Sequence, residues 1–345
     1  MEGTTKIKTV LVAASRKIHS DFSFKQLTSG HINQTYLVNN NGEQLLLQRL
    51  NMQVFKNLEG ISQNILAVGK HLKQKAYSDE ILELLPFVDG DYLYEGEWRM
   101  FKYMQNTQTF LKVQSEKQTY EAAKFLSAFH ASLSDIELQN ITDSIDGFLD
   151  FKMRSEQYQE ALQNATENRL KKAEESIIFL KENKNILEEW HGLLPQIPKR
   201  VIHADPKISN FLFDKEDENK VVALIDWDTI LRGSILYDFG DMVRSYTNLK
   251  EEDCAEVGDN FSLENYKALE KGFLYYLSNT LTDKEIQNLE LGAKTVIYVQ
   301  AMRFLTDYLN GDIYYSVQRP EHNLDRAKSQ INLLNDLQST VSVRK

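Results

Sequence analysis

The sequence contains very little cysteine, because Cys254 is the only one among 345 residues. A single cysteine excludes an intramolecular disulfide and a metal centre built from several thiolates, and it agrees with a reducing compartment. Long apolar runs are also lacking. The short run at residues 10–14 is followed by polar residues and is too brief for a signal peptide. No stretch approaches the ~20 apolar residues that span a bilayer. We therefore expect a cytoplasmic protein without a membrane partner.

Positive charge is in deficit, with 40 lysines and arginines against 50 acidic residues and a formal net charge of -10. An acidic surface repels the phosphate backbone, so a nucleic acid is not an expected partner. A neutral or cationic small-molecule ligand suits this chain better. The apolar content of 42% is sufficient for a buried core, which excludes a disordered chain. At roughly 150 residues per domain, the length indicates about two units.

The first hundred residues have the composition of β-strands. Asn-Gly at positions 41 and 42 favours a tight hairpin between two of them, because this pair accepts the positive φ angles of such turns. After the hairpin, apolar residues recur with a helical period over residues 58–75. The expected strands are residues 24–27, 31–38, 44–50 and 98–104.

After a polar break at residues 105–107, the sequence is mostly helical. We expect one long, charged surface helix over residues 165–190. Only one strand pair is expected in this half, formed by residues 211–213 and 221–225 around a polar turn. The other expected helices lie within residues 120–133, 286–304 and 322–337. The chain therefore divides into a β-rich lobe, residues 1–104, and a helical lobe, residues 105–345.

The most informative segment is residues 201–210, in which Asp205 follows His203 by two residues and Asn210 follows Asp205 by five. Asp226 comes sixteen residues after Asn210, at the end of a predicted buried strand. Phosphoryl transfer needs one carboxylate to accept the proton of the attacking hydroxyl, and Asp205 fits this role. It also needs oxygen ligands for Mg²⁺, which Asn210 and Asp226 supply. We expect His203 to brace the loop.

This pattern, completed by Asp226-Trp227-Asp228, resembles the catalytic and metal-binding segments of the aminoglycoside phosphotransferase and choline kinase superfamily. The resemblance implies an α+β fold of the two-lobed protein-kinase-like type, with a small β-rich N-lobe that binds nucleotide and a larger, mostly helical C-lobe that binds substrate. It also implies ATP and Mg²⁺ as cofactors, with Asp228 as a further metal residue.

The expected nucleotide site carries weaker motifs. The loop over the phosphates would fall at residues 29–34 and include Gly30, His31 and Asn33, but it has one glycine where protein kinases have three. The strand at residues 45–50 lacks the usual lysine, and Arg49 is its only cation, with Glu59 as a candidate partner. The backbone of residues 99–104, which include Phe101 and Tyr103, is expected to contact the adenine.

Several segments look like the N-acetylhexosamine 1-kinase branch of this superfamily, over roughly residues 28–330. They include residues 30–33, 47–51, 232–234, 237–244 and 303–312. The resemblance implies phosphorylation of the anomeric hydroxyl of N-acetylglucosamine or N-acetylgalactosamine, with Asp205, Asp241 and Arg303 at the amino sugar. Pro206 and Ser209 depart from the branch pattern.

Other interpretations remain open. Arg303 could instead pair with Asp307, four residues along, and Asp241 and Asp238 could brace the metal loop. The acceptor could be an aminoglycoside, choline or homoserine, and an acceptor pocket rich in carboxylates would favour these. A non-catalytic, nucleotide-binding pseudokinase is the alternative from another class. Such proteins usually lose the base or a metal ligand, whereas this chain retains both.

Overall fold

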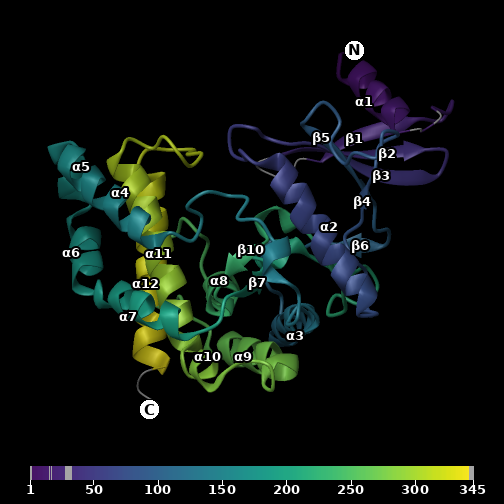
Figure 1. Cartoon of the computed structure of the whole chain (residues 1–345). Coiled ribbons are helices and arrows are strands. Elements are labelled where there is room, and N and C mark those ends of the chain that lie inside the picture. Colours follow the sequence, from purple (N-terminus) through teal and green to yellow (C-terminus); the bar gives the residue numbers. More distant parts are fainter. Residues whose placement is uncertain (1, 15, 17, 28–32, 342–345) are drawn as a thin grey trace.

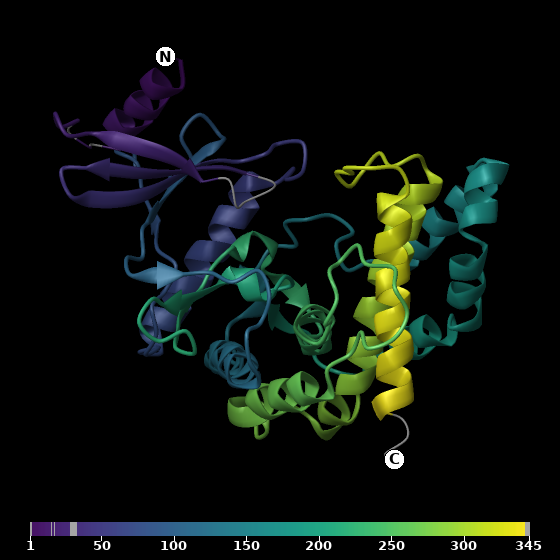
Figure 2. The same ribbon diagram turned by 180° about the vertical axis from the view of Figure 1, so that it is seen from behind.

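The computed structural model describes residues 2–14, 16, 18–27 and 33–341. The chain forms two lobes, a small one built on a sheet and a larger helical one (Figures 1 and 2). This arrangement confirms the expected kinase-like fold. Within the described ranges, no helix has the length and apolar character needed to span a bilayer.

The N-lobe sheet has five antiparallel strands in the order β1-β2-β3-β5-β4. The predicted hairpin joins β2 and β3, where Asn41 and Gly42 have φ angles of 56° and 82° and Asn40 lies opposite Glu43. The strands are β1 (Ser23–Leu27), β2 (Gln34–Asn40), β3 (Glu43–Arg49), β4 (Leu84–Leu85) and β5 (Trp98–Lys102).

Two helices cover opposite faces of this sheet. Side chains alternate along a strand, so Met100 of β5 packs in the cluster that contains helix α1 (Glu2–Ala13). Its neighbour Phe101 packs in the larger cluster that contains helix α2 (Leu58–Gln74). The N-terminal helix α1 was not expected from the sequence. It forms because Ile7, Val10 and Leu11 share one helical face, which is fully buried against the sheet.

The C-lobe holds two small sheets, so the expectation of a single strand pair is wrong. The predicted pair is β8 (Phe211–Asp214) and β9 (Val221–Leu224). The short strand β6 (Thr107–Gln108) pairs with β8 and extends this sheet to three strands. A second sheet pairs β7 (Arg200–Ile202) with β10 (Leu231–Gly233). The strands that were not expected, β6, β7 and β10, have two or three residues each, too few for a periodic signal in the sequence.

The remaining elements of the C-lobe are helical. They are α3 (Glu116–Ser132), η1 (Leu138–Asn140), α4 (Phe151–Asn164), α5 (Glu167–Lys172), α6 (Glu174–Glu182), α7 (Asn185–Leu193), η2 (Leu194–Gln196), η3 (Ile208–Asn210), η4 (Trp227–Thr229), α8 (Ile235–Tyr246), α9 (Leu263–Leu277), α10 (Asp283–Gln287), α11 (Leu289–Leu309) and α12 (His322–Val341). Figure 1 shows α4 to α7 packed beside α11 and α12 at the far side of the lobe from the sheet.

The long helix expected over residues 165–190 is broken into α5, α6 and α7. Leu180 and Ile186 are both buried, although a straight helix would place them about 120° apart around its axis. The breaks change the direction of the chain, so that each short helix turns its own apolar residues toward the core. The segment is therefore a curved wall of the lobe.

Two glycines allow α8 to approach α11 closely. A β-carbon at Gly240 would lie 2.4 Å from the carbonyl oxygen of Gly292, and one at Gly292 would lie 2.5 Å from that of Leu236. Helix α8 thereby sits deep in the lobe, where its Asp238 reaches the loop that follows β7.

Candidate active site

Asp205 lies in the loop that leaves β7, and two side chains fix its position. Lys207 Nζ is 2.6 Å from Asp205 Oδ2. Asn210 donates from Nδ2 to the same oxygen at 3.0 Å and to the Asp205 carbonyl at 2.8 Å. Burial lowers the pKa of Lys207, but attraction by Asp205, Asp226 and Asp241 outweighs it, and the net shift is upward. Lys207 is therefore cationic, and it holds the carboxylate in one orientation.

The loop itself is held by Asp238 of α8. The backbone N–H groups of His203 and Ala204 each donate to its carboxylate at 2.8 Å, and His130 pairs with it at 3.0 Å. Two backbone donors to one carboxylate are needed here because Ala204 has a positive φ of 65°, which is unfavourable for a residue with a β-carbon.

His203 braces the loop from inside, as expected. Its Nε2 lies 3.0 Å from the carbonyl of Ile225, and its Nδ1 accepts from the N–H of Asp205 at 3.3 Å. Burial lowers the pKa of His203. The ring is therefore neutral, with its proton on Nε2, and it links the loop after β7 to the end of β9.

Asp226 stands at a left-handed turn directly after β9, with φ 63° and ψ 54°. The turn brings its carboxylate near those of Asp205 and Asp228. Loss of hydration at the carboxyl group, followed by repulsion from Asp228 and Asp205, raises the pKa of Asp226 to about 7, although the residue as a whole is exposed. A group of carboxylates that repel one another is the electrostatic setting that a divalent cation relieves.

Asn210 and Asp226 together fit such a cation. The Asn210 amide nitrogen makes two bonds inside the loop, so its oxygen is the atom that remains for a cation. The N–H of Ile225 donates to the Asn210 carbonyl at 2.8 Å, which keeps the two residues adjacent. The described part of the chain has no cluster of three or more His, Cys, Asp or Glu side chains that could hold a metal. This site would instead use one amide, one carboxylate and phosphate oxygens.

Asp228 is engaged by the N-lobe. Arg99 of β5 contacts both of its carboxylate oxygens, at 2.7 and 2.9 Å, and each side chain is only 2% exposed. Asn33 donates to the same carboxylate at 3.1 Å. The guanidinium of Arg99 is held in turn by the side-chain oxygen of Gln48 at 2.7 and 2.9 Å. This buried ion pair joins the two lobes beside Asp226.

The predicted nucleotide residues are not all brought together. Arg49 pairs with Glu97 at 2.9 Å rather than with Glu59, which is exposed on the first turn of α2. Phe101 is buried beneath the Arg99 guanidinium, and Tyr103 follows β5 in the connection to the C-lobe. Asn33 reaches the site through Asp228, whereas Gly30 and His31 lie outside the described residues.

Helix α2 contributes a buried asparagine, and not the carboxylate of Glu59, to the contacts near the site. Asn64 is fully buried and donates to the carbonyls of Thr142 and Ile230 at 2.8 and 2.9 Å, while its oxygen accepts from the N–H of Thr142 at 2.8 Å. All of these partners belong to the C-lobe, so Asn64 fixes α2 next to the segment that carries Asp226 and Asp228.

Asp241 lies on α8, one turn after Asp238. Arg244 donates from Nε to Asp241 Oδ1 at 2.8 Å, whereas the buried Oδ2 has no hydrogen-bond partner among the described residues. Burial raises the pKa of Asp241, although Arg244 opposes the shift. Asp241 therefore does not brace the metal loop, and it retains an oxygen that can accept a hydrogen bond.

Arg303 does not pair with Asp307. It donates to the side chain of Gln300 at 3.2 Å and lies 5.7 Å from the centre of the Tyr315 ring. Asp307 is fully used elsewhere, because it accepts the N–H groups of residues 313–315 and the amide of Asn323. A second guanidinium, that of Arg154, is close by: burial and the charge of Arg303 lower the pKa of Arg154.

Sequence reasoning missed three residues of this site, namely Arg99, Lys207 and Arg154. Arg99 carried a signal, because it is the one charged residue within the apolar strand residues 98–101, and a buried cation requires an anionic partner. Lys207 lies in the motif itself. Nothing local distinguishes Arg154 from other charged residues of α4.

A family model decides the classification. The model described as the phosphotransferase enzyme family (APH) matches residues 23–270, which is most of the chain. The chain belongs to the phosphotransferase enzyme family. The range of this phosphotransferase that matches the model includes the loop after β7 and both aspartates after β9.

Solved structures share the fold of this phosphotransferase over nearly its whole length. A microcompartment-associated aminopropanol kinase is similar with a TM-score of 0.70 and 15% identity, covering 98% of each chain. Spectinomycin phosphotransferase APH(9)-Ia, solved with ADP and spectinomycin, has a TM-score of 0.60 and 11% identity, covering 98% of each chain. Choline kinase from Cryptosporidium parvum has a TM-score of 0.56 and 18% identity, covering 99% of this chain and 98% of the other.

Proposed function

We propose that this phosphotransferase transfers the γ-phosphoryl group of ATP to the anomeric hydroxyl of an N-acetylhexosamine. Asp205 accepts the hydroxyl proton, the acceptor oxygen attacks the γ-phosphorus, and ADP leaves. The observation that carries the chemistry is the fixed position of Asp205 beside Asn210 and Asp226. Mg²⁺ at Asn210 and Asp226 would neutralise the phosphate charge. Arg99 contacts both carboxylate oxygens of Asp228. We therefore assign Asp228 a role in ordering the site and not in binding the metal.

The acceptor side supports an oxygen-rich, uncharged molecule. Arg303 and Arg154 lie together among tyrosines, and burial together with repulsion between the two guanidiniums lowers the pKa of Arg154. Such a pair repels the ammonium groups of choline or an aminoglycoside, whereas it offers donors to hydroxyl and carbonyl oxygens. The free oxygen of Asp241 would accept from a sugar hydroxyl.

The test is an acceptor screen with ATP and Mg²⁺ that measures ADP release and locates the phosphate by phosphorus NMR. The panel contains N-acetylglucosamine, N-acetylgalactosamine, hexoses without the acetamido group, kanamycin, choline and homoserine. We expect turnover of an N-acetylhexosamine to its 1-phosphate. Turnover of only a cationic acceptor would contradict the sugar assignment and leave the phosphotransfer chemistry in place.

Asp205→Asn separates catalysis from binding. We expect transfer to fall by at least about 10³-fold, because the acceptor loses its base, while the affinity for ATP changes little. Asp217→Asn, on the polar turn between β8 and β9, is the matched control and should retain full activity. Wild-type turnover in Asp205→Asn would show that another group takes the proton.

A further inference from the structure

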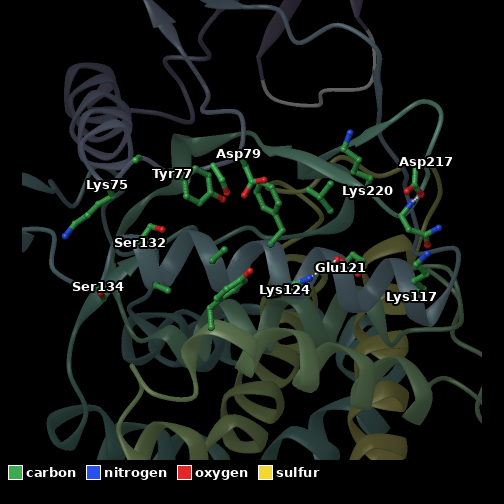
Figure 3. A pocket seen from close by; sticks show the side chains of 18 of the residues that line it. Lys75, Tyr77, Asp79, Lys117, Glu121, Lys124, Ser132, Ser134, Asp217 and Lys220 are labelled. Atoms are coloured by element: carbon green, nitrogen blue, oxygen red, sulfur yellow. Dashed lines mark hydrogen bonds and ion pairs between the residues drawn. The ribbon is translucent and has the colours of Figure 1, made fainter.

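A second concave site lies beside the turn that joins β8 and β9. Asn210 and Asp226 are at the other end of this hairpin, before β8 and after β9. This pocket has a volume of about 900 Å³, which is within the range of small-molecule sites. Its walls come from the connection between α2 and β4, from α3, from the turn between β8 and β9, and from Tyr276 of α9 (Figure 3). Its lining includes none of the residues assigned above to the active site.

An acidic side chain lies between aromatic rings in this pocket. Tyr77 and Asp79 are adjacent in Figure 3, and the buried Tyr77 hydroxyl has no hydrogen-bond partner among the described residues. The Tyr77 ring packs edge-on against Phe125 of α3, with centres 6.3 Å apart. Tyr276 also lines the pocket and is near enough to Tyr77 to influence its hydroxyl. The centre of the pocket therefore combines one carboxylate with three aromatic rings.

Asp79 forms no ion pair among the described residues, although four lysines line the pocket. One of them, Lys117, lies at the other end of the pocket from Asp79 (Figure 3). The other three have partners of their own. Lys75 pairs with Asp135, Lys220 with Asp214 at 3.0 Å, and Lys124 with Glu121 at 3.7 Å. The ammonium of Lys124 lies 4.8 Å from the centre of the Tyr275 ring, which lines no part of the pocket. Loss of hydration raises the pKa of Asp79, as expected for a partly buried carboxylate without a neutralising cation.

We propose that this pocket binds a small organic cation, an alkylammonium ion, with its charge at Asp79 and its apolar groups against Tyr77, Phe125 and Tyr276. Ammonium groups are attracted by aromatic faces as well as by the carboxylate, and their alkyl substituents fill the space between the rings. An anion does not suit this centre, because Asp79 would repel it.

The ligand would bridge the two lobes. Residues 75–79 continue from α2 of the N-lobe, whereas Phe125 and Tyr276 belong to the C-lobe. The N–H of Glu80 already donates to the carbonyl of Val222 in β9 at 3.3 Å, so this connection rests directly on the hairpin that carries the catalytic residues. Binding is therefore expected to raise the thermal stability of the whole chain.

Tetramethylammonium chloride is a suitable probe, because it has no hydroxyl and cannot be a phosphoryl acceptor. Calorimetric titration of the full chain without nucleotide should show saturable binding, and Tm should rise above that in sodium chloride of equal concentration. Asp79→Asn should weaken binding by at least about tenfold, and Tyr276→Ala by about threefold or more. Asp217→Asn, at the rim, and Tyr275→Ala, the adjacent tyrosine of similar exposure, should remain within twofold.

Three results would overturn the proposal: no saturable heat, the same Tm shift with sodium chloride, or equal affinity in Asp79→Asn. Circular dichroism of each variant shows whether it is folded, so that a lost signal is not mistaken for unfolding. The outcome is independent of the acceptor screen, since neither ATP nor acceptor is present.

Discussion

At the scale of single residues, the site holds carboxylates that repel one another in the absence of a cation. Asp226 is held in a left-handed conformation beside two other carboxylates, and its pKa is raised to about 7. Strain and repulsion of this kind are characteristic of functional positions, because a ligand that supplies the missing charge then binds strongly. The fold tolerates the arrangement because Asp238, His203 and Asn210 fix the surrounding backbone.

Asp226→Asn should therefore stabilise the metal-free protein while it abolishes transfer. A carboxyl group with a raised pKa in the folded state binds more protons there than in the unfolded chain, so its contribution to stability falls as pH rises from about 4 through 7. The variant has no carboxyl group at this position, so its stability does not fall with pH for this reason. Asparagine also accepts a left-handed conformation. In EDTA, its gain in Tm over the wild type should be largest at pH 8.

That gain should shrink as the pH is lowered from 8 toward 4. Asp217→Asn, which replaces an exposed carboxyl on the turn between β8 and β9, should show no such trend. A Tm difference that is independent of pH would contradict the raised pKa of Asp226.

At the scale of elements, the close approach of α8 to α11 determines the positions of Asp238 and Asp241 on α8. The β-carbon of an alanine at Gly240 would lie 2.4 Å from a backbone carbonyl, which cannot move without moving α11. We expect Gly240→Ala to lower the free energy of unfolding by about 1–3 kcal/mol, through overpacking. Urea denaturation followed by circular dichroism measures the effect.

The matched control is Gly192→Ala on α7, where a β-carbon would meet nothing within 4 Å. There the substitution should raise stability by up to ~1 kcal/mol, because alanine favours the helix more than glycine does. Equal effects of the two substitutions would show that the α8–α11 approach is not close enough to constrain α8.

At the scale of the whole molecule, the lobes are joined by buried polar contacts. Asn64 and Arg99 each reach from the N-lobe to the segment that carries Asp226, and Arg99 and Asp228 form a pair that is 2% exposed on both sides. Removal of one partner of a buried ion pair leaves the other charge without compensation, which is the main cause of the resulting loss in stability.

Arg99→Met should therefore destabilise the protein by about 3–5 kcal/mol. The double variant Arg99→Met/Asp228→Asn should recover much of this loss, because no uncompensated charge remains. Urea denaturation of the two single variants and the double variant gives the coupling energy. Additive losses, without recovery, would show that the pair contributes little across the lobes.

The sequence by itself determined the class of the fold and the chemical groups at its centre. Local signals were sufficient for the β2–β3 hairpin and for the separation into a β-rich and a helical lobe, because turn chemistry and periodicity act over a few residues. The spacing of Asp205, Asn210 and Asp226 predicted a phosphotransferase pattern, and the family match agrees with it.

Only the tertiary structure decided the partners of these groups. Arg49 turns to Glu97, while Arg99, from a strand about fifty residues further along, reaches Asp228. The short strands β7 and β10 pair across about thirty residues, and α5, α6 and α7 bend around the core instead of continuing as one helix. Such choices depend on which distant segments share a buried space, because an ion pair or a three-residue strand has no local signal in the sequence.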